Sequence, residues 1–117
     1  MQHAKANRTL GRKRDQRTAL LRGLAVSLIR DGKIKTTEAK AKELRPFVER
    51  LVTYGKKNTV ASRRLASSTL GAPQQQTLTK LFGEIAENYK ERSGGYTRII
   101  KMGRTPAGRD EAVIEFV

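Results

Sequence analysis

The sequence contains no cysteine and no tryptophan, and it has one histidine among 117 residues. Without cysteine, a disulfide framework and a cysteine-based zinc site are both excluded. The composition also fits a reducing compartment. The one histidine, His3, has no carboxylate near it in the sequence, so it makes a poor metal site and a poor general base. We therefore expect no catalytic residue, no metal and no cofactor.

Long apolar runs and acidic residues are also scarce. No apolar run approaches the ~18 residues of a membrane span, and the N-terminus lacks the apolar region of a signal peptide. Acidic residues number 11 against 25 lysines and arginines, which gives a formal net charge of +14. Solubility needs a net charge of only about 2–8 on a small domain, so this excess is typical of a nucleic-acid-binding protein.

The positive charge is concentrated near the N-terminus, because residues 1–57 carry 16 basic and 5 acidic side chains. Residues 1–14 contain five lysines and arginines and no acid, and after Met1 the only large apolar side chain among them is Leu10. Such a segment cannot bury enough apolar surface to order itself, whereas the phosphates of a polyanion can order it. We predict a basic arm over residues 1–14 and a single domain over residues 15–117. An organelle transit peptide is the alternative, but the segment has no amphipathic period.

Two amphipathic helices are predicted in the first half of the domain. Apolar residues recur every three or four positions over residues 20–29, which predicts a helix that begins near Asp15 as its N-cap and ends at Gly32. A second helix is predicted from Thr37, as its cap, to Gly55. Pro46 lies inside this pattern and predicts either a kink or a break.

Two further helices are predicted before the C-terminal segment. A short helix is expected from about residue 59 to residue 66, with Val60, Ala61 and Leu65 facing inward. A linker of small residues over 67–73 separates it from a helix whose first turn holds Pro73. That last helix has the clearest period in the chain, and Ser93-Gly94-Gly95 breaks it.

Three short β-branched segments predict strands at residues 33–37, 96–102 and 112–116. The connection over residues 103–110 is compatible with antiparallel pairing of the last two strands. The order of elements indicates an α+β fold, in which a small sheet of about three strands is covered by three to four helices.

Binding to phosphate is the chemistry that this composition favours, since arginine holds phosphate bidentately and lysine acts as a point charge. If the arm neutralises five phosphates, the log–log salt slope of binding is expected to be about −4. Backbone contacts carry no sequence information, so specificity comes from RNA shape. Most aromatic residues lie on apolar faces, so a base-stacking platform is not expected. Tyr96 beside Arg98 either meets an RNA base or packs at the start of a strand.

Several short motifs, taken in order, resemble a known family. They are Met1-Gln2-His3 with Arg8, Leu10 and Arg12, then IKTT at 34–37, AKELR at 41–45, Ser62-Arg63-Arg64, KLF at 80–82 and GGYTRI at 94–99. Together they resemble ribosomal protein seventeen of the bacterial large subunit, and the match runs from Met1 to Val117. Gln2, Ala4 and residues 14–17 depart from the usual family pattern, which affects individual arm contacts rather than the resemblance.

The resemblance implies a non-catalytic structural component of the large ribosomal subunit in the cytoplasm. Its implied partners are large-subunit rRNA and neighbouring large-subunit proteins near the exit region, with no membrane and no small-molecule substrate. The candidate RNA-binding residues are His3, Lys5, Arg8, Arg12, Lys13, Arg14, Arg17, Arg22, Lys33, Lys35, Arg63, Arg64, Tyr96 and Arg98.

Two other classes share the positive charge. A general DNA-binding protein is expected to show a duplex-binding module, such as a helix-turn-helix or dimerising basic helices, and the sequence contains neither. A membrane-active cationic protein needs an exposed amphipathic helix. Residues 20–29 are instead expected to belong to the core, because the chain supplies other elements for them to pack against.

Overall fold

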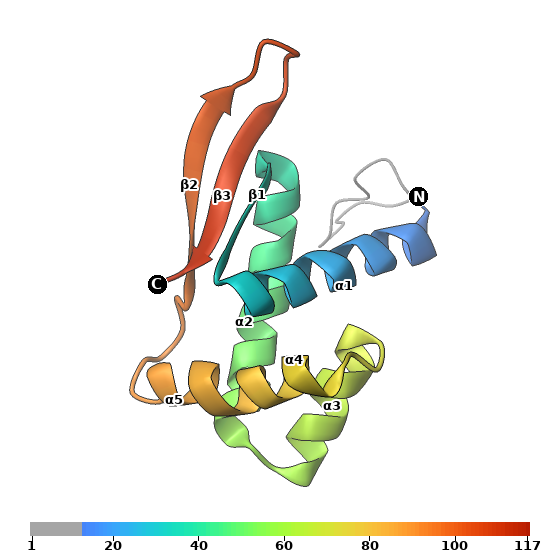
Figure 1. The fold of residues 1–117 in the computed structure, drawn as a ribbon, viewed down its shortest axis with the longest axis vertical. Helices are drawn as coiled ribbons and strands as arrows, with labels where there is room; N and C mark the ends of the chain where they lie inside the picture. Colours follow the sequence, from blue (N-terminus) through green and yellow to red (C-terminus); the bar gives the residue numbers. More distant parts are fainter. Residues whose placement is uncertain (1–12) are drawn as a thin grey trace, which may run out of the picture.

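The computed structural model describes residues 13–117, and this part of the chain has the predicted α+β fold. The helices are α1 (Arg14–Asp31), α2 (Glu38–Lys57), α3 (Val60–Leu70), α4 (Gln75–Lys80), the π-helical η1 (Leu81–Ile85) and α5 (Ala86–Asn88). The strands are β1 (Lys33–Thr37), β2 (Thr97–Arg104) and β3 (Asp110–Phe116). In Figure 1 the sheet lies beside the upper part of α2, α1 packs across α2 below the sheet, and α3, α4 and α5 form the lower part of the molecule.

The three strands form one antiparallel sheet with β3 in the centre. Two neighbouring rows of the register are Lys33–Glu115–Arg98 and Ile34–Ile114–Ile99. Successive side chains of a strand point to opposite faces, so the isoleucine row packs on the helices and the charged row faces solvent. Ile114 is accordingly fully buried in the core, and Lys33 and Arg98 are exposed.

The β2–β3 hairpin is longer, and its loop shorter, than the sequence predicts. β2 continues to Arg104 and β3 begins at Asp110, with a β-bulge between Lys101 and Gly103. A bulge adds one unpaired residue and increases the local twist. The end of the hairpin extends beyond the helices at the top of Figure 1.

Helix α1 ends as predicted but begins differently. Gly32 adopts a left-handed conformation (φ 82°), and its N–H donates to the carbonyl of Leu28. At the other end the N-cap is Lys13, and Asp15 lies in the first turn. The predicted cap at Asp15 is wrong because the N–H of Arg17 already bonds to the carbonyl of Lys13, which closes the first turn upstream.

Helix α2 begins at its predicted cap, where the Thr37 side chain accepts a hydrogen bond from the N–H of Lys40. Pro46 lies inside the helix, which continues without a break to Lys57. The predicted end at Gly55 is wrong. Gly55 is buried inside the helix rather than at its end. The carbonyl oxygen of Leu81 lies only 2.9 Å from where a Cβ of residue 55 would stand, so there is no room for a side chain at this position.

Helix α3 is longer than predicted and has the opposite face inward. It runs to Leu70, so the predicted linker over 67–73 begins too early. A capping box between Thr59 and Ser62 sets the start of the helix. The face of α3 that packs against the rest of the domain holds Ser62, Ala66 and Leu70. The residues predicted to face inward, Val60, Ala61 and Leu65, are exposed. The small side chains at the first two buried positions allow α3 to approach α2 closely.

The last predicted helix is three consecutive segments, α4, η1 and α5. It starts at Gln75 rather than at Pro73, and it ends at Asn88, earlier than the Ser93-Gly94-Gly95 break. The π turn of η1 holds one more residue than an α turn, so a 3.6-residue apolar period does not reveal it. Leu81 and Ile85, two apolar residues of this period, are buried.

The glycine pair before β2 is held by a carboxylate of α2. Gly94 and Gly95 both have positive φ angles, 88° and 64°. Glu49 accepts hydrogen bonds from the N–H of Gly95 (3.2 Å), and from the N–H (3.0 Å) and hydroxyl (2.9 Å) of Thr97. The glycine-rich motif therefore turns the chain so that the start of β2 is fixed to α2.

Candidate nucleic-acid interface

Four candidates, His3, Lys5, Arg8 and Arg12, lie outside the described residues. The next two, Lys13 and Arg14, are exposed at the beginning of α1. Neither forms an ion pair within residues 13–117. Their side chains are therefore available for phosphate at the point where the basic segment joins the domain.

Arg17 and Arg22 act inside the domain. Arg17 pairs with the buried carboxylate of Glu43 at 3.3 Å, and its side chain is only 18% exposed. The guanidinium of Arg22 donates to the carbonyl oxygens of Thr69 (2.9 Å) and Ser68 (3.3 Å) at the C-terminal end of α3, and the Ser68 carbonyl also accepts from the N–H of Gly71 (3.2 Å). These two arginines tie α1 to α2 and to α3.

The strand candidates lie together on the open face of the sheet. Lys33 and Lys35 on β1 and Arg98 on β2 are all exposed. Lys35 pairs with Glu111 at 3.2 Å and Arg98 with Glu115 at 3.4 Å. Exposed ion pairs contribute only about 0–1 kcal/mol, so phosphate can compete for these cations.

The projecting hairpin carries basic residues that the sequence analysis did not single out. Lys101, Arg104 and Arg109 are exposed there, and Arg109 pairs with Glu111 at 3.4 Å. The sequence shows cations on both sides of a predicted turn. It does not show that this turn extends past the helices, which is what makes these side chains accessible to a large ligand.

Arg63 and Arg64 form a separate basic group on α3. The guanidinium of Arg63 lies 5.5 Å from the centroid of the Phe82 ring, and its Nε donates to the side-chain oxygen of Asn58 at 2.9 Å. Arg64 is exposed on the adjacent position of the helix. This group lies on the lower part of the molecule, away from the sheet.

Tyr96 packs in the core and presents no face to a base. Its side chain is 4% exposed, and its ring lies 5.5 Å from that of Tyr89. Lys56 donates a hydrogen bond of 2.8 Å to the Tyr96 hydroxyl, which lowers the pKa of this phenol. Of the two roles that the sequence left open for Tyr96, the geometry matches packing at the start of a strand.

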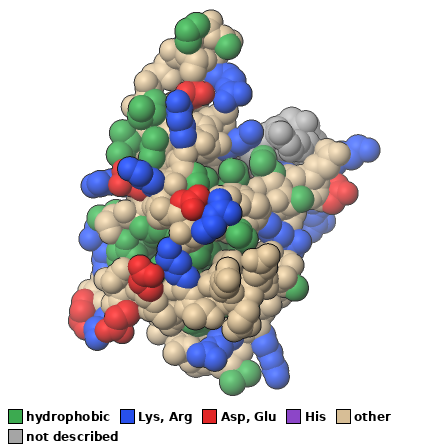
Figure 2. Space-filling model, viewed as in Figure 1, with side chains coloured by type: hydrophobic (Ala, Val, Ile, Leu, Met, Phe, Trp, Pro, Cys, Tyr) green, Lys and Arg blue, Asp and Glu red, His purple; other side chains and the backbone are tan. Residues whose placement is uncertain are grey.

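Basic side chains are spread over the visible surface, and several of them lie beside acidic ones. Figure 2 shows several acidic side chains gathered at the lower left, over the end of α5, and basic side chains together with an acidic one at the far right, where α1 begins. Over residues 13–117, no helix is long and apolar enough to cross a membrane. Nor does any group of three His, Cys, Asp or Glu residues stand together as metal ligands in that range.

The family profile and the similar proteins of known family agree with each other. The sequence profile of the family described as ribosomal protein L17 matches residues 20–117. Proteins named large ribosomal subunit protein bL17 from Staphylococcus epidermidis and Staphylococcus aureus are each 54% identical to this chain, and each match covers 94% of this chain and 98% of the relative. The corresponding protein of Staphylococcus haemolyticus is also 54% identical, with 97% of its length covered. These relatives are named as ribosomal proteins, which agrees with the expectation of a non-enzymatic protein.

Proposed function

Because the chain belongs to the ribosomal protein L17 family, we propose that it is a structural constituent of the large subunit of the bacterial cytoplasmic ribosome. It binds large-subunit rRNA through the basic segment of residues 1–14 and through exposed cations of the folded domain. Its other partners are neighbouring proteins of the large subunit near the exit region.

The observation that supports this function most directly is the placement of unpaired positive charge. Lys13 and Arg14 are exposed where the basic segment enters α1, and the acidic end of α5 lies far from them. An RNA phosphate chain that follows residues 1–14 therefore meets the cations Lys13 and Arg14 as it reaches the domain, where Asp15 is the acidic residue in the first turn of α1. Each neutralised phosphate releases condensed counterions, which makes the binding strongly dependent on salt.

The candidates divide into two roles in this proposal. Lys33, Lys35, Arg98 and the hairpin residues Arg104 and Arg109 contact RNA from the open sheet face and the hairpin. Arg17 and Arg22 support the fold instead, since their guanidinium groups already bond to Glu43 and to the end of α3. Backbone contacts of this kind position the RNA and recognise its shape rather than its sequence.

The test compares salt dependence in two full-length triple variants with equal loss of charge. The first replaces Lys5, Arg8 and Arg12 by glutamine, and the control replaces the exposed Arg30, Lys90 and Arg92 by glutamine. Filter binding to large-subunit rRNA over a range of salt is expected to give a log–log slope shallower by about 2–3 in the first variant, at ~0.7–0.9 per contact. The control is expected to retain the wild-type slope. Equal slopes in the first variant and the wild type contradict the role of the basic segment.

A further inference from the structure

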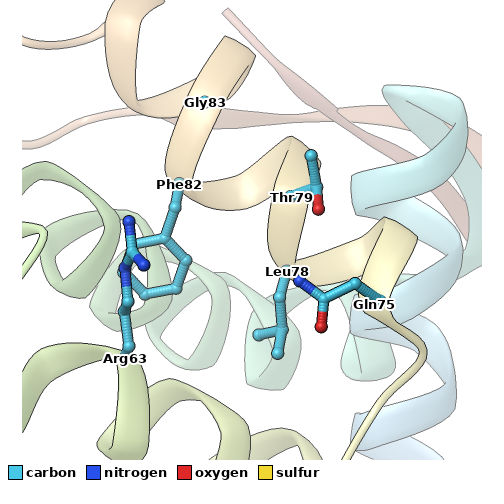
Figure 3. A pocket seen from close by; sticks show the side chains of 6 residues that line it. All are labelled: Arg63, Gln75, Leu78, Thr79, Phe82 and Gly83. Carbon is cyan, nitrogen blue, oxygen red and sulfur yellow. The ribbon is translucent and has the colours of Figure 1, made fainter. Parts of the chain in front are cut away.

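A surface pocket lies between α3 and the α4–η1 run, outside the sheet and hairpin surface. Six residues line it, namely Arg63, Gln75, Leu78, Thr79, Phe82 and Gly83, and its volume is about 430 Å³. This size is within the range of small-ligand pockets, about 300–1,000 Å³. Figure 3 shows that Leu78 and Phe82 form its apolar wall, with Gln75 beside Leu78 and the Arg63 guanidinium beside the Phe82 ring.

The planar groups of this pocket are held in place before any ligand arrives. Phe82 is partly buried and packs against the core, so its ring cannot move freely. Arg63 lies over that ring at 5.5 Å and is also fixed by its hydrogen bond to Asn58. An aromatic ring and a guanidinium plane are the two side-chain surfaces on which unstacked RNA bases stack.

The other lining residues provide hydrogen bonds and space. The exposed Gln75 carboxamide carries a donor and an acceptor, and Thr79 adds a hydroxyl. No atom lies within 4 Å of the position where a Cβ of Gly83 would stand, so this side of the pocket is open. Gly83 belongs to the π turn of η1, and π turns inside helices occur frequently at functional sites.

The charge around the pocket favours a nucleic acid over a peptide. The chain contains no Asp or Glu between Glu49 and Glu84, and this interval supplies both walls of the pocket. It contains six cations, which are Arg50, Lys56, Lys57, Arg63, Arg64 and Lys80. None of the lining residues is acidic and Arg63 is a cation, which suits a nucleobase whose own phosphate lies on the surface beside Arg64.

We propose that this pocket binds one unpaired base of the RNA. The base stacks on the guanidinium plane of Arg63, which itself lies over the Phe82 ring, its phosphate meets Arg64, and Gln75 pairs with its edge. The carboxamide fits a base that presents a ring acceptor beside an amino donor, as adenine and cytosine do. This inference rests on the proposed function, because it assigns a specific contact to the same RNA.

The test is dimethyl sulfate probing of large-subunit rRNA bound by the full-length protein, since this reagent modifies N1 of adenine and N3 of cytosine when they are exposed. The wild type is expected to protect at least one unpaired adenine or cytosine. Gln75→Met is expected to restore the reactivity of that nucleotide. The matched control is Gln76→Met, because Gln76 is the exposed neighbour that lines a different cavity between α1 and α4. Phe82→Leu is expected to lower rRNA affinity about tenfold through the loss of stacking.

The possible results separate the two proposals. If the wild type does not bind rRNA, the proposed function fails. If it binds but Gln75→Met and Gln76→Met give the same protections as the wild type, the pocket assignment alone is overturned. Cross-linking of a photoreactive residue at position 79 to a ribosomal protein, rather than to RNA, in assembled subunits also overturns it. Urea unfolding of Phe82→Leu shows whether a loss of affinity reflects a folded variant.

Discussion

Replacing Gly55 by alanine tests how closely α2 and η1 approach each other. Alanine is the better helix former, and in an open helix the change stabilises a protein by about 0.5–1 kcal/mol. The structure predicts the opposite sign at this position. The new Cβ would stand 2.9 Å from the backbone oxygen of Leu81 and 3.6 Å from the Cβ of Ala86.

The magnitude follows from two opposing effects. The nearest atom is a backbone carbonyl oxygen rather than the end of a flexible side chain, so α2 and η1 must separate to admit the methyl group. Overpacking of this kind costs about 1–3 kcal/mol, which exceeds the gain in helix propensity. We therefore expect Gly55→Ala to lower the free energy of unfolding by about 1–2 kcal/mol.

Gly23→Ala provides the control, because Gly23 is an exposed residue inside α1 with no atom within 4 Å of its Cβ position. It is expected to raise the free energy of unfolding by about 0.5–1 kcal/mol. Urea unfolding followed by circular dichroism measures both variants, and equal m-values show that the difference lies in stability. If both variants are stabilised equally, the close approach of α2 to η1 is refuted.

Two carboxylates give further predictions. Glu49→Gln should lower the free energy of unfolding by about 1.5–3 kcal/mol, because one of the two oxygens that accept from Gly95 and Thr97 becomes a donor. Glu91→Gln, at an exposed position, is the control in the same urea assay. If both variants change the free energy of unfolding by the same small amount, the anchoring role of Glu49 is contradicted. The hydrogen bond from Lys42 lowers the pKa of the Glu38 carboxyl group in the folded protein. The Glu38 carboxylate therefore stabilises the fold at pH values above its unfolded pKa of about 4.3. This contribution disappears as the pH falls through the lower folded pKa. The stability difference between wild type and Glu38→Gln should therefore shrink between neutral pH and about pH 3 in a pH series of unfolding curves, and a difference that grows in acid is incompatible with this assignment.

The parts of the fold that follow from local chemistry were predictable from the sequence. The end of α1 depends on Gly32, which needs a left-handed conformation, and the start of α2 depends on the Thr37 cap. The strands follow from β-branched runs. Each of these signals lies within a few residues of the feature that it specifies, so no knowledge of the tertiary structure is needed to interpret it.

The features that sequence reasoning missed depend on contacts between distant elements. Nothing next to Gly55 shows that the Leu81 carbonyl will lie against it, so a glycine that permits close packing was interpreted as a helix end. The orientation of α3 was predicted from its apolar residues, yet the buried face uses Ser62 and Ala66 because small side chains fit against α2. The GGYTRI motif at 94–99 likewise gives no sign that Glu49 of α2 accepts hydrogen bonds from Gly95 and Thr97.

The candidate nucleic-acid interface also combines residues whose position follows from local sequence with residues whose role depends on contacts between distant elements. Lys13, Lys33 and Arg64, which the family resemblance gives as candidate RNA contacts, are exposed. Arg22 was grouped with them, although its guanidinium bonds to the end of α3, 46 and 47 residues away in the sequence. Charge alone does not distinguish an arginine that supports the fold from one that is available to a partner.

The position of β3 has a consequence for how the protein is made. This strand is the central one of the sheet, but it follows every other described element in the chain. While the polypeptide grows, β1 and β2 emerge without the neighbour to which both must pair, and each keeps an unsatisfied edge that other chains can join. The sheet therefore cannot be completed until the ribosome has released Asp110–Phe116.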